Sequence, residues 1–99
     1  MPFTQIIEVR TDAPDVLQAH VAAYHAAEAG RAPGYRRARV LEEGNRPGTY
    51  LIEVDFTSVE EAKENSARRE TDEWARKLQR LIKGEPTYRN LNELCSTES

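Results

Sequence analysis

Residues 35–61, YRRARVLEEGNRPGTYLIEVDFTSVEE, decide the fold, because they predict two strands, a connecting turn and a capped helix start. Pairing the strands so that Arg39 faces Glu53 also places Arg37 opposite Asp55. The same register gathers apolar residues on the other face of the hairpin, namely Ala38, Val40, Ile52 and Val54. A shift of one residue would mix the two sets, so the pattern specifies the pairing.

The rest of the order is read outward from this hairpin. Its strands are expected at 35–43 and 49–57, joined by the loop 44–48, which is rich in turn-forming residues. Before it, alternation predicts a strand over 3–10, with Phe3, Ile7 and Val9 on one face. A helix should follow to about residue 28, with Asp12 as its cap.

After the hairpin, Ser58 and Glu61 have the spacing of a capping box and predict a second helical region that extends to about residue 83. The stretch 65–72 is polar, so we expect a break there, with Thr71 as a second candidate cap. The apolar spacing after the break predicts a core-facing stripe. It consists of Trp74, Leu78, Leu81 and Ile82. A fourth strand is expected at 87–94.

The order strand–helix–strand–strand–helix–strand predicts a ferredoxin-like α+β fold with a four-stranded antiparallel sheet and both helical regions on one face. We expect one domain over 1–94 and a polar tail over 95–99. The charged face of the hairpin would then meet either solvent or a second subunit. The sequence leaves both alternatives open.

Composition limits the classes of function. The formal net charge of −3 disfavours nucleic-acid binding, which needs a basic surface. The single cysteine, Cys95, excludes an internal disulfide, and no spacing suggests a metal site. No apolar run approaches the length of a membrane span and no signal-peptide pattern is present, so we expect a soluble, cytoplasmic protein with no membrane partner. A chain of 99 residues forms a thin core, which favours a homodimer.

Three segments carry a resemblance to a known family: Gly34-Tyr35, the stretch 49–62, and Trp74 with the four residues after it. Together they resemble the dimeric α+β barrel superfamily, and its antibiotic biosynthesis monooxygenase-like group in particular. The resemblance implies a homodimer closed by two sheets packed face to face, with a small-molecule pocket between the helices and the sheet of each subunit. It also implies a cofactor-independent monooxygenase acting on a small aromatic or polyketide-like molecule.

Other members of that superfamily degrade heme with an asparagine on the first strand and a tryptophan and a histidine in the second helical region. Here the first strand has no asparagine. The position of the family's tryptophan falls near Asn65, and that of its histidine falls near Trp74. No histidine follows His25, so heme degradation is disfavoured.

For the site itself, His20 is the predicted catalytic base, because a neutral imidazole can take a proton from an acidic phenol or anthrone near neutral pH. Tyr24 lies four residues further along the same helix face. The predicted substrate-binding residues are Tyr24, His25, Tyr50, Asn65 and Trp74. The alternatives are a non-catalytic small-molecule-binding or stress-related protein, and a purely structural interaction module. The binding protein would have the same pocket, and the interaction module would have no enclosed apolar pocket. The structural interpretation of the individual residues is that Tyr24 and Trp74 are core residues and Asn65 a cap or a surface residue.

Overall fold

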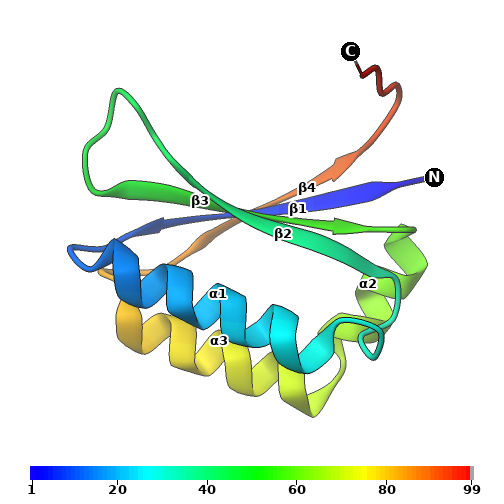
Figure 1. Cartoon of the computed structure of the whole chain (residues 1–99), viewed down its shortest axis with the longest axis horizontal. Coiled ribbons are helices and arrows are strands. Elements are labelled where there is room, and N and C mark those ends of the chain that lie inside the picture. The colour runs from blue at the N-terminus through cyan, green and yellow to red at the C-terminus, as the bar shows by residue number, and fades with distance from the viewer. Residues whose placement is uncertain (99) are drawn as a thin grey trace.

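The structure is a computed structural model, and it describes residues 1–98. All the expected elements are present, within a few residues of their predicted bounds (Figure 1). They are β1 (Phe3–Arg10), α1 (Pro14–Glu28), β2 (Tyr35–Glu42), β3 (Thr49–Phe56), α2 (Val59–Ser66), α3 (Arg69–Leu81) and β4 (Thr87–Asn92). The predicted break is the gap between α2 and α3. Of the predicted tail, Ser99 lies outside the described residues.

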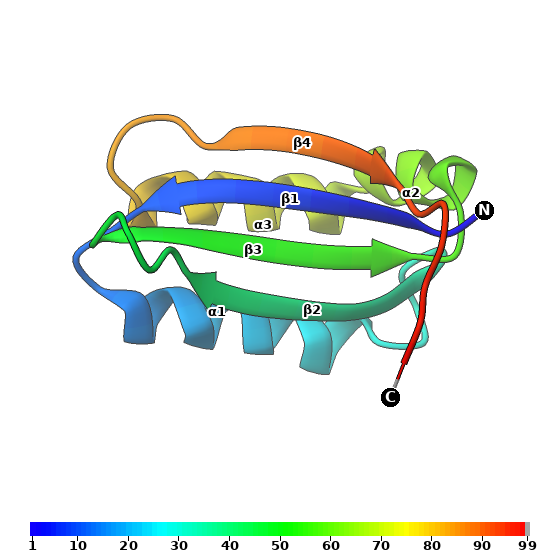
Figure 2. The ribbon, with the colours of Figure 1, turned by 90° about the horizontal axis from the view of Figure 1, so that it is seen from above.

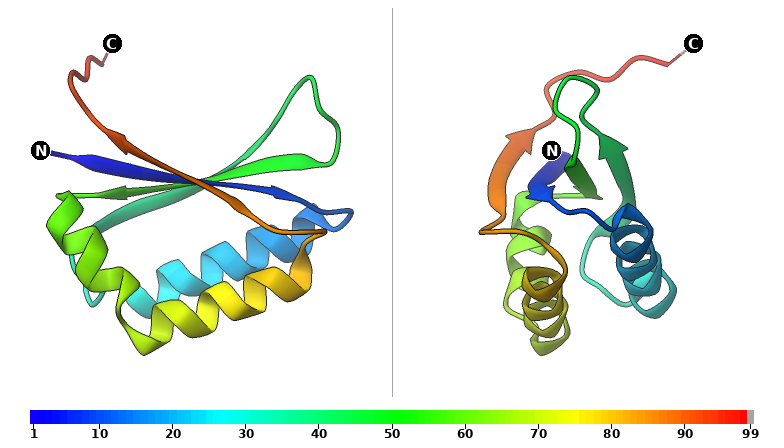
Figure 3. Two further views of the ribbon diagram at one scale, coloured as in Figure 1. Left: turned by 180° about the vertical axis from the view of Figure 1, so that it is seen from behind. Right: turned by 90° about the vertical axis from the view of Figure 1, so that its left-hand side faces the viewer.

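The four strands form one antiparallel sheet in the order β2-β3-β1-β4 (Figure 2). Each helical connection therefore joins two strands that are separated by one strand in the sheet. This is the ferredoxin-like arrangement that the sequence predicted. Helices α1 and α3 lie side by side under one face, and the end-on view in Figure 3 shows the sheet and helices as two layers.

The hairpin register is confirmed. Arg39 pairs with Glu53 and Arg37 with Asp55, and each guanidinium lies 2.6 Å from the opposing carboxylate. The apolar face of the hairpin is the one that the helices cover, since Ile52 is fully buried. Ile52 packs in the main core with Leu17 of α1 and Leu78 of α3, which are also fully buried.

The cap predicted for α1 is wrong. The N-cap is Ala13, and Asp12 is exposed and pairs with Lys83. The hydroxyl of Thr11 stabilises the start of the helix instead. It accepts a hydrogen bond from the Ala13 N–H at 3.0 Å and donates one to the Leu81 carbonyl at 3.1 Å. Thr11 is buried, so the start of α1 is fixed by a contact with the end of α3.

The predicted cap of α2 is confirmed, whereas the cap of α3 differs from prediction. Ser58 accepts from the Glu61 N–H at 3.2 Å, as in a capping box, but the Glu61 carboxylate binds the hydroxyl of Thr57. The N-cap of α3 is Arg68, so the prediction of Thr71 as a cap is wrong. Thr71 lies in the first turn of α3, and its hydroxyl turns back to the side chain of Asn65.

The sheet face away from the helices is open in this structure. Its ion pairs alternate with apolar side chains, which are Ile6, Leu41, Leu51 and Leu91. Strand β4 forms an edge whose residues are all exposed. Among the described residues, no helix is long and apolar enough to cross a membrane.

Candidate functional site

A cavity lies between the helix-covered face of the sheet and the three helices. Its volume is about 40 Å³. The walls are mainly apolar side chains of the three central elements β1, β3 and α1, closed by the indole of Trp74 from α3. The lining residues are Gln5, Ile7, Val21, Tyr24, Ala38, Ile52, Val54, Phe56, Asn65, Thr71 and Trp74.

The volume decides what the cavity can hold in this structure. A water molecule occupies roughly 30 Å³ in the liquid, and a protein cavity of roughly 150 Å³ accommodates benzene. The cavity of about 40 Å³ therefore fits a water molecule or dioxygen. An aromatic ligand needs the side chains around the cavity to move apart.

One end of the cavity is polar. Asn65, at the end of α2, is 4% exposed, and its amide nitrogen donates to the hydroxyl of Tyr24 at 3.0 Å. Its amide oxygen lies 3.2 Å from the same hydroxyl and 3.1 Å from the Thr71 hydroxyl, which donates to it. The break between α2 and α3 makes this cluster, because it turns Asn65 and Thr71 toward α1. Hydrogen-bonding groups thus face an apolar space, which is the usual composition of a small-molecule site.

An ion pair stands behind this polar end. Arg68, in the break, donates to Glu28 at 2.7 Å and to the Asn65 amide oxygen at 3.2 Å. Glu28 is the last residue of α1 and is buried. Carboxylates are rarely buried unless they are paired, and Arg68 is the partner of Glu28. The hydrogen bond from Arg68 to Glu28 raises the pKa of the Arg68 guanidinium above its ordinary value.

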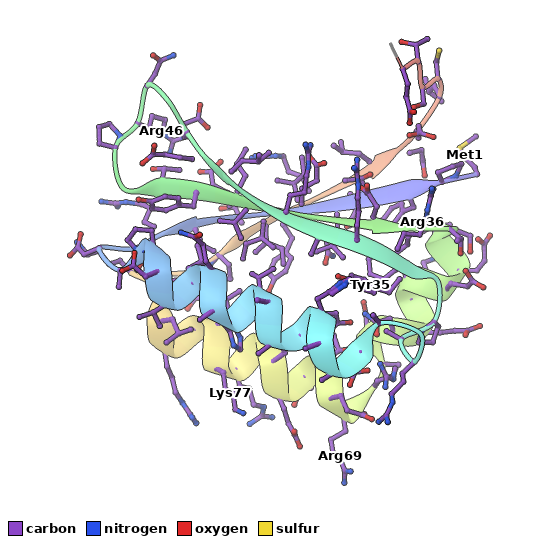
Figure 4. The ribbon with its side chains drawn as sticks, viewed as in Figure 1. Met1, Tyr35, Arg36, Arg46, Arg69 and Lys77 are labelled. Atoms are coloured by element: carbon purple, nitrogen blue, oxygen red, sulfur yellow. The ribbon has the colours of Figure 1, made fainter. Side chains whose placement is uncertain are left out.

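The structure places His20 next to Trp74 but outside the lining of the cavity. Its imidazole stacks on the indole, with ring centroids 4.7 Å apart and planes within 6°. His20 Nε2 lies 3.0 Å from the Trp74 carbonyl, so this nitrogen carries a proton and donates it. On its other side His20 borders a shallow hollow on the outer surface of the helices with Lys77, which projects from α3 away from the sheet (Figure 4).

His25 and Tyr50 also lie away from the cavity. His25 is exposed, and its Nδ1 lies in hydrogen-bond distance of the hydroxyl of Tyr35, at 2.6 Å. Burial, with a smaller contribution from Tyr24, raises the pKa of Tyr35 above its ordinary value, so its hydroxyl keeps its proton at neutral pH. Tyr50 is buried in the main core and borders a separate surface hollow.

Of the six predicted site residues, the structure therefore brings Tyr24, Asn65 and Trp74 together around one cavity. Sequence reasoning missed Gln5, Thr71 and the pair Glu28–Arg68. The sequence pattern could have indicated Gln5, because it shares the inward face of β1 with Phe3 and Ile7. No local sequence pattern could have indicated the ion pair, since 40 residues separate its partners. No group of three or more potential ligand side chains among the described residues could hold a metal ion.

No family model matches the sequence, and no curated protein matches it either. Solved structures do match its fold. A candidate antibiotic biosynthesis monooxygenase from Bordetella bronchiseptica has a TM-score of 0.80 at 15% identity, over 95% of this chain and 98% of the other. SnoaB, a cofactor-independent oxygenase from Streptomyces nogalater, has a TM-score of 0.77 at 19% identity, over 99% of this chain and 98% of the other. SnoaB also matches in a variant with one asparagine replaced by alanine.

These likenesses establish the class of fold, which is that of the antibiotic biosynthesis monooxygenase-like proteins. A third structure, a candidate monooxygenase of the same kind from Nitrosomonas europaea, has a TM-score of 0.75 at 15% identity over 98% of this chain and 94% of the other. The predicted resemblance is thus confirmed for the fold. Activity has to be argued from the site.

Proposed function

We propose that the protein is a cofactor-independent monooxygenase that acts on a small aromatic or polyketide-like molecule. The observation that carries the proposal is the buried Asn65 amide beside the Tyr24 hydroxyl, at one end of an otherwise apolar cavity. SnoaB, which shares the fold, is described as a cofactor-independent oxygenase.

The proposed reaction converts an activated methylene to a carbonyl. The substrate releases a proton to solvent as it binds, which gives an anion delocalised onto its oxygen, and this anion reduces dioxygen. One oxygen atom enters the product as the carbonyl and the other leaves as water, together with the two hydrogens of the methylene. The chain's contribution is to hold the substrate oxygen through Tyr24 and Asn65, and to exclude water with the apolar walls.

The residues that line the cavity include no imidazole and no carboxylate. His20 was predicted as the base, but its Nε2 is bound to the Trp74 carbonyl and its ring faces the indole. We therefore assign His20 to the support of Trp74. The hydrogen bonds from Tyr24 and Asn65 would favour ionisation of the substrate itself, because hydrogen bonds to a charged form stabilise it.

We also propose that the protein is a homodimer that covers the open sheet face. The support is the set of apolar side chains on that face, together with the small core of a 99-residue domain. Residues such as Leu41 and Leu51 would then leave solvent, beside the cross-strand ion pairs of the same face.

The test is oxygen consumption by the purified protein with an anthrone, in buffer that contains a metal chelator and no flavin. Uptake of one dioxygen per anthrone supports the proposal. A second candidate, a binding protein without turnover, is favoured by the missing base. It predicts that the anthrone raises the melting temperature without any uptake of oxygen.

A further inference from the structure

We propose that Glu28 and Arg68 are positioning residues that fix the orientation of the Asn65 amide and thereby make the Tyr24 hydroxyl a donor to an anionic or carbonyl oxygen of the ligand. The inference deepens the proposed function by naming the chemistry that the cavity selects. It rests on that site, but it does not require that the bound molecule be oxygenated.

The first step is the orientation of the amide. A guanidinium only donates hydrogen bonds and stays charged at all relevant pH values. Arg68 lies 3.2 Å from the Asn65 side chain, so the amide oxygen has to face it. The flipped amide would direct N–H groups at the cation. Glu28, 2.7 Å from Arg68 and 8% exposed, holds the guanidinium in this place.

The second step concerns the lone pairs of the amide oxygen. Arg68 takes one of the two, and the Thr71 hydroxyl, at 3.1 Å, takes the other. Because the oxygen is turned to these donors, the amide nitrogen faces Tyr24 and donates to its hydroxyl at 3.0 Å.

The third step follows for the Tyr24 proton. Among the protein groups around it, its acceptor is the same amide oxygen at 3.2 Å, which already has two donors. A ligand oxygen in the cavity can take this proton and leave no buried acceptor unpaired, so donation to the ligand costs little. A ligand that offers only N–H groups cannot take this proton, which then stays on the amide oxygen that already has two donors.

The ligand class is therefore a planar apolar molecule with an acceptor oxygen, and best of all a phenolate or enolate, because charged acceptors form the stronger hydrogen bonds. The positive charge of Arg68 lies behind Asn65 and favours a negative charge on the ligand oxygen. Gln5, on the opposite wall, is already bonded to Asn90 of β4.

The first experiment titrates 4-nitrophenol bound to the protein, with the visible absorbance of its phenolate as the readout. The pKa of the bound probe should lie about one pH unit below that of the free probe. Tyr24→Phe should remove the shift. The double variant Glu28→Gln/Arg68→Met should reduce the shift by at least half. This variant leaves the net charge unchanged, and it creates no buried carboxylate without a partner.

The matched control is Arg69→Met. Arg69 neighbours Arg68 but projects into solvent from α3, with a side chain that is 85% exposed (Figure 4). The substitution removes one positive charge near the site without changing a contact of Asn65, so the pKa shift of the probe should persist. An equal loss of the shift in Arg69→Met and in the double variant would overturn the positioning role. Failure of 4-nitrophenol to bind, or binding without any pKa shift, would overturn the ligand class.

The second experiment needs no ligand and reads the amide of Asn65 directly by NMR. In the wild-type protein its side-chain NH₂ signals should be resolved and slow to exchange with solvent. In the double variant they should move and exchange faster, while in Arg69→Met they should stay in place. Unchanged Asn65 signals in a folded double variant would contradict the proposal. A probe shift without oxygen uptake from an anthrone would leave this inference standing and remove only the proposed oxygenase activity.

Discussion

His20 and Trp74 hold each other through two reciprocal hydrogen bonds between side chain and backbone. His20 Nε2–H donates to the Trp74 carbonyl at 3.0 Å, and Trp74 Nε1–H donates to the His20 carbonyl at 3.2 Å. The two rings stack over this pair. The contact joins α1 to α3 and fixes the indole that forms one wall of the cavity. It is therefore a structural link, with consequences that differ from those of a catalytic base.

Replacing His20 by alanine separates these two roles. We expect His20→Ala to lower the free energy of unfolding by about 1–2 kcal/mol, because one hydrogen bond and a ring contact are lost. Oxygen uptake should fall by less than about tenfold, whereas removal of a general base costs about 100-fold to 10,000-fold. Urea unfolding and steady-state kinetics on the same preparation check both numbers. A large fall in kcat with unchanged stability would restore His20 as the base.

Gly34 should be intolerant of any side chain. It has a positive φ of +67°, and a Cβ would lie 2.6 Å from Glu61 Cβ and 2.8 Å from the Thr57 hydroxyl. We expect Gly34→Ala to cost about 2–4 kcal/mol, from left-handed backbone strain and this overlap together. Gly30→Ala is the matched control, since φ there is +83° and nothing lies within 4 Å. It should show only the backbone cost of about 1–2 kcal/mol. Equal losses in urea unfolding would argue against the close approach.

Asp55 makes stability depend on pH in the acid range. Burial by itself would raise the pKa of Asp55, but hydrogen bonds from Arg37 and Thr4 outweigh it and hold the pKa below the ordinary value of 3.8. The folded state therefore gains stability above that value and loses it as the pH falls through the lowered pKa. Because Arg37 is largely exposed, the gain should stay below about 1 kcal/mol.

The comparison of wild type with Asp55→Asn tests this sign. The variant should be the less stable protein at pH 7, and the difference should shrink toward zero as the pH drops below the ordinary carboxyl range. Glu85→Gln, at an exposed position in the loop between α3 and β4, serves as the control and should give no such trend. A difference that grows in acid would contradict the assignment.

The open sheet face should be the dimer contact. Leu51→Lys places a charge in the middle of this face, on the central strand β3, and should convert the dimer to a monomer in light scattering. Val16→Lys is the control, because Val16 is an exposed apolar residue on α1, on the other side of the molecule. A wild-type protein that stays monomeric at all concentrations tested would contradict the proposed homodimer.

The sequence predicted those parts of the fold that depend on neighbours along the chain. The register of Arg39 with Glu53 follows from alternation in two adjacent strands, and it was right to the residue. Caps were predicted less well, because Thr11 replaces Asp12 through a contact with Leu81, which lies 70 residues away. Local spacing contains no information about such a partner.

The same difference between local and long-range contacts applies to the candidate site. The positions of Tyr24, Asn65 and Trp74 between the helices and the sheet could be predicted, since each is a polar or aromatic residue at a helix stripe or break. The pair Glu28–Arg68 could not, because α1 and the α2–α3 break meet only in the folded chain. The position of His20 was misjudged for a related reason. Its spacing from Tyr24 fixes a helix face, but the indole of α3 decides which part of that face reaches the cavity.

The central claim is that Tyr24 and Asn65 hold a substrate which then reacts with dioxygen. The most direct measurement is the rate of oxygen uptake with an anthrone for wild type, Tyr24→Phe and Tyr88→Phe, the last being the same change at an exposed site on β4. The account predicts that Tyr24→Phe loses at least about tenfold in kcat/KM, as expected for one hydrogen bond to a charged oxygen, while Tyr88→Phe matches wild type. Equal rates in all three proteins, or no uptake by the wild type, would contradict it.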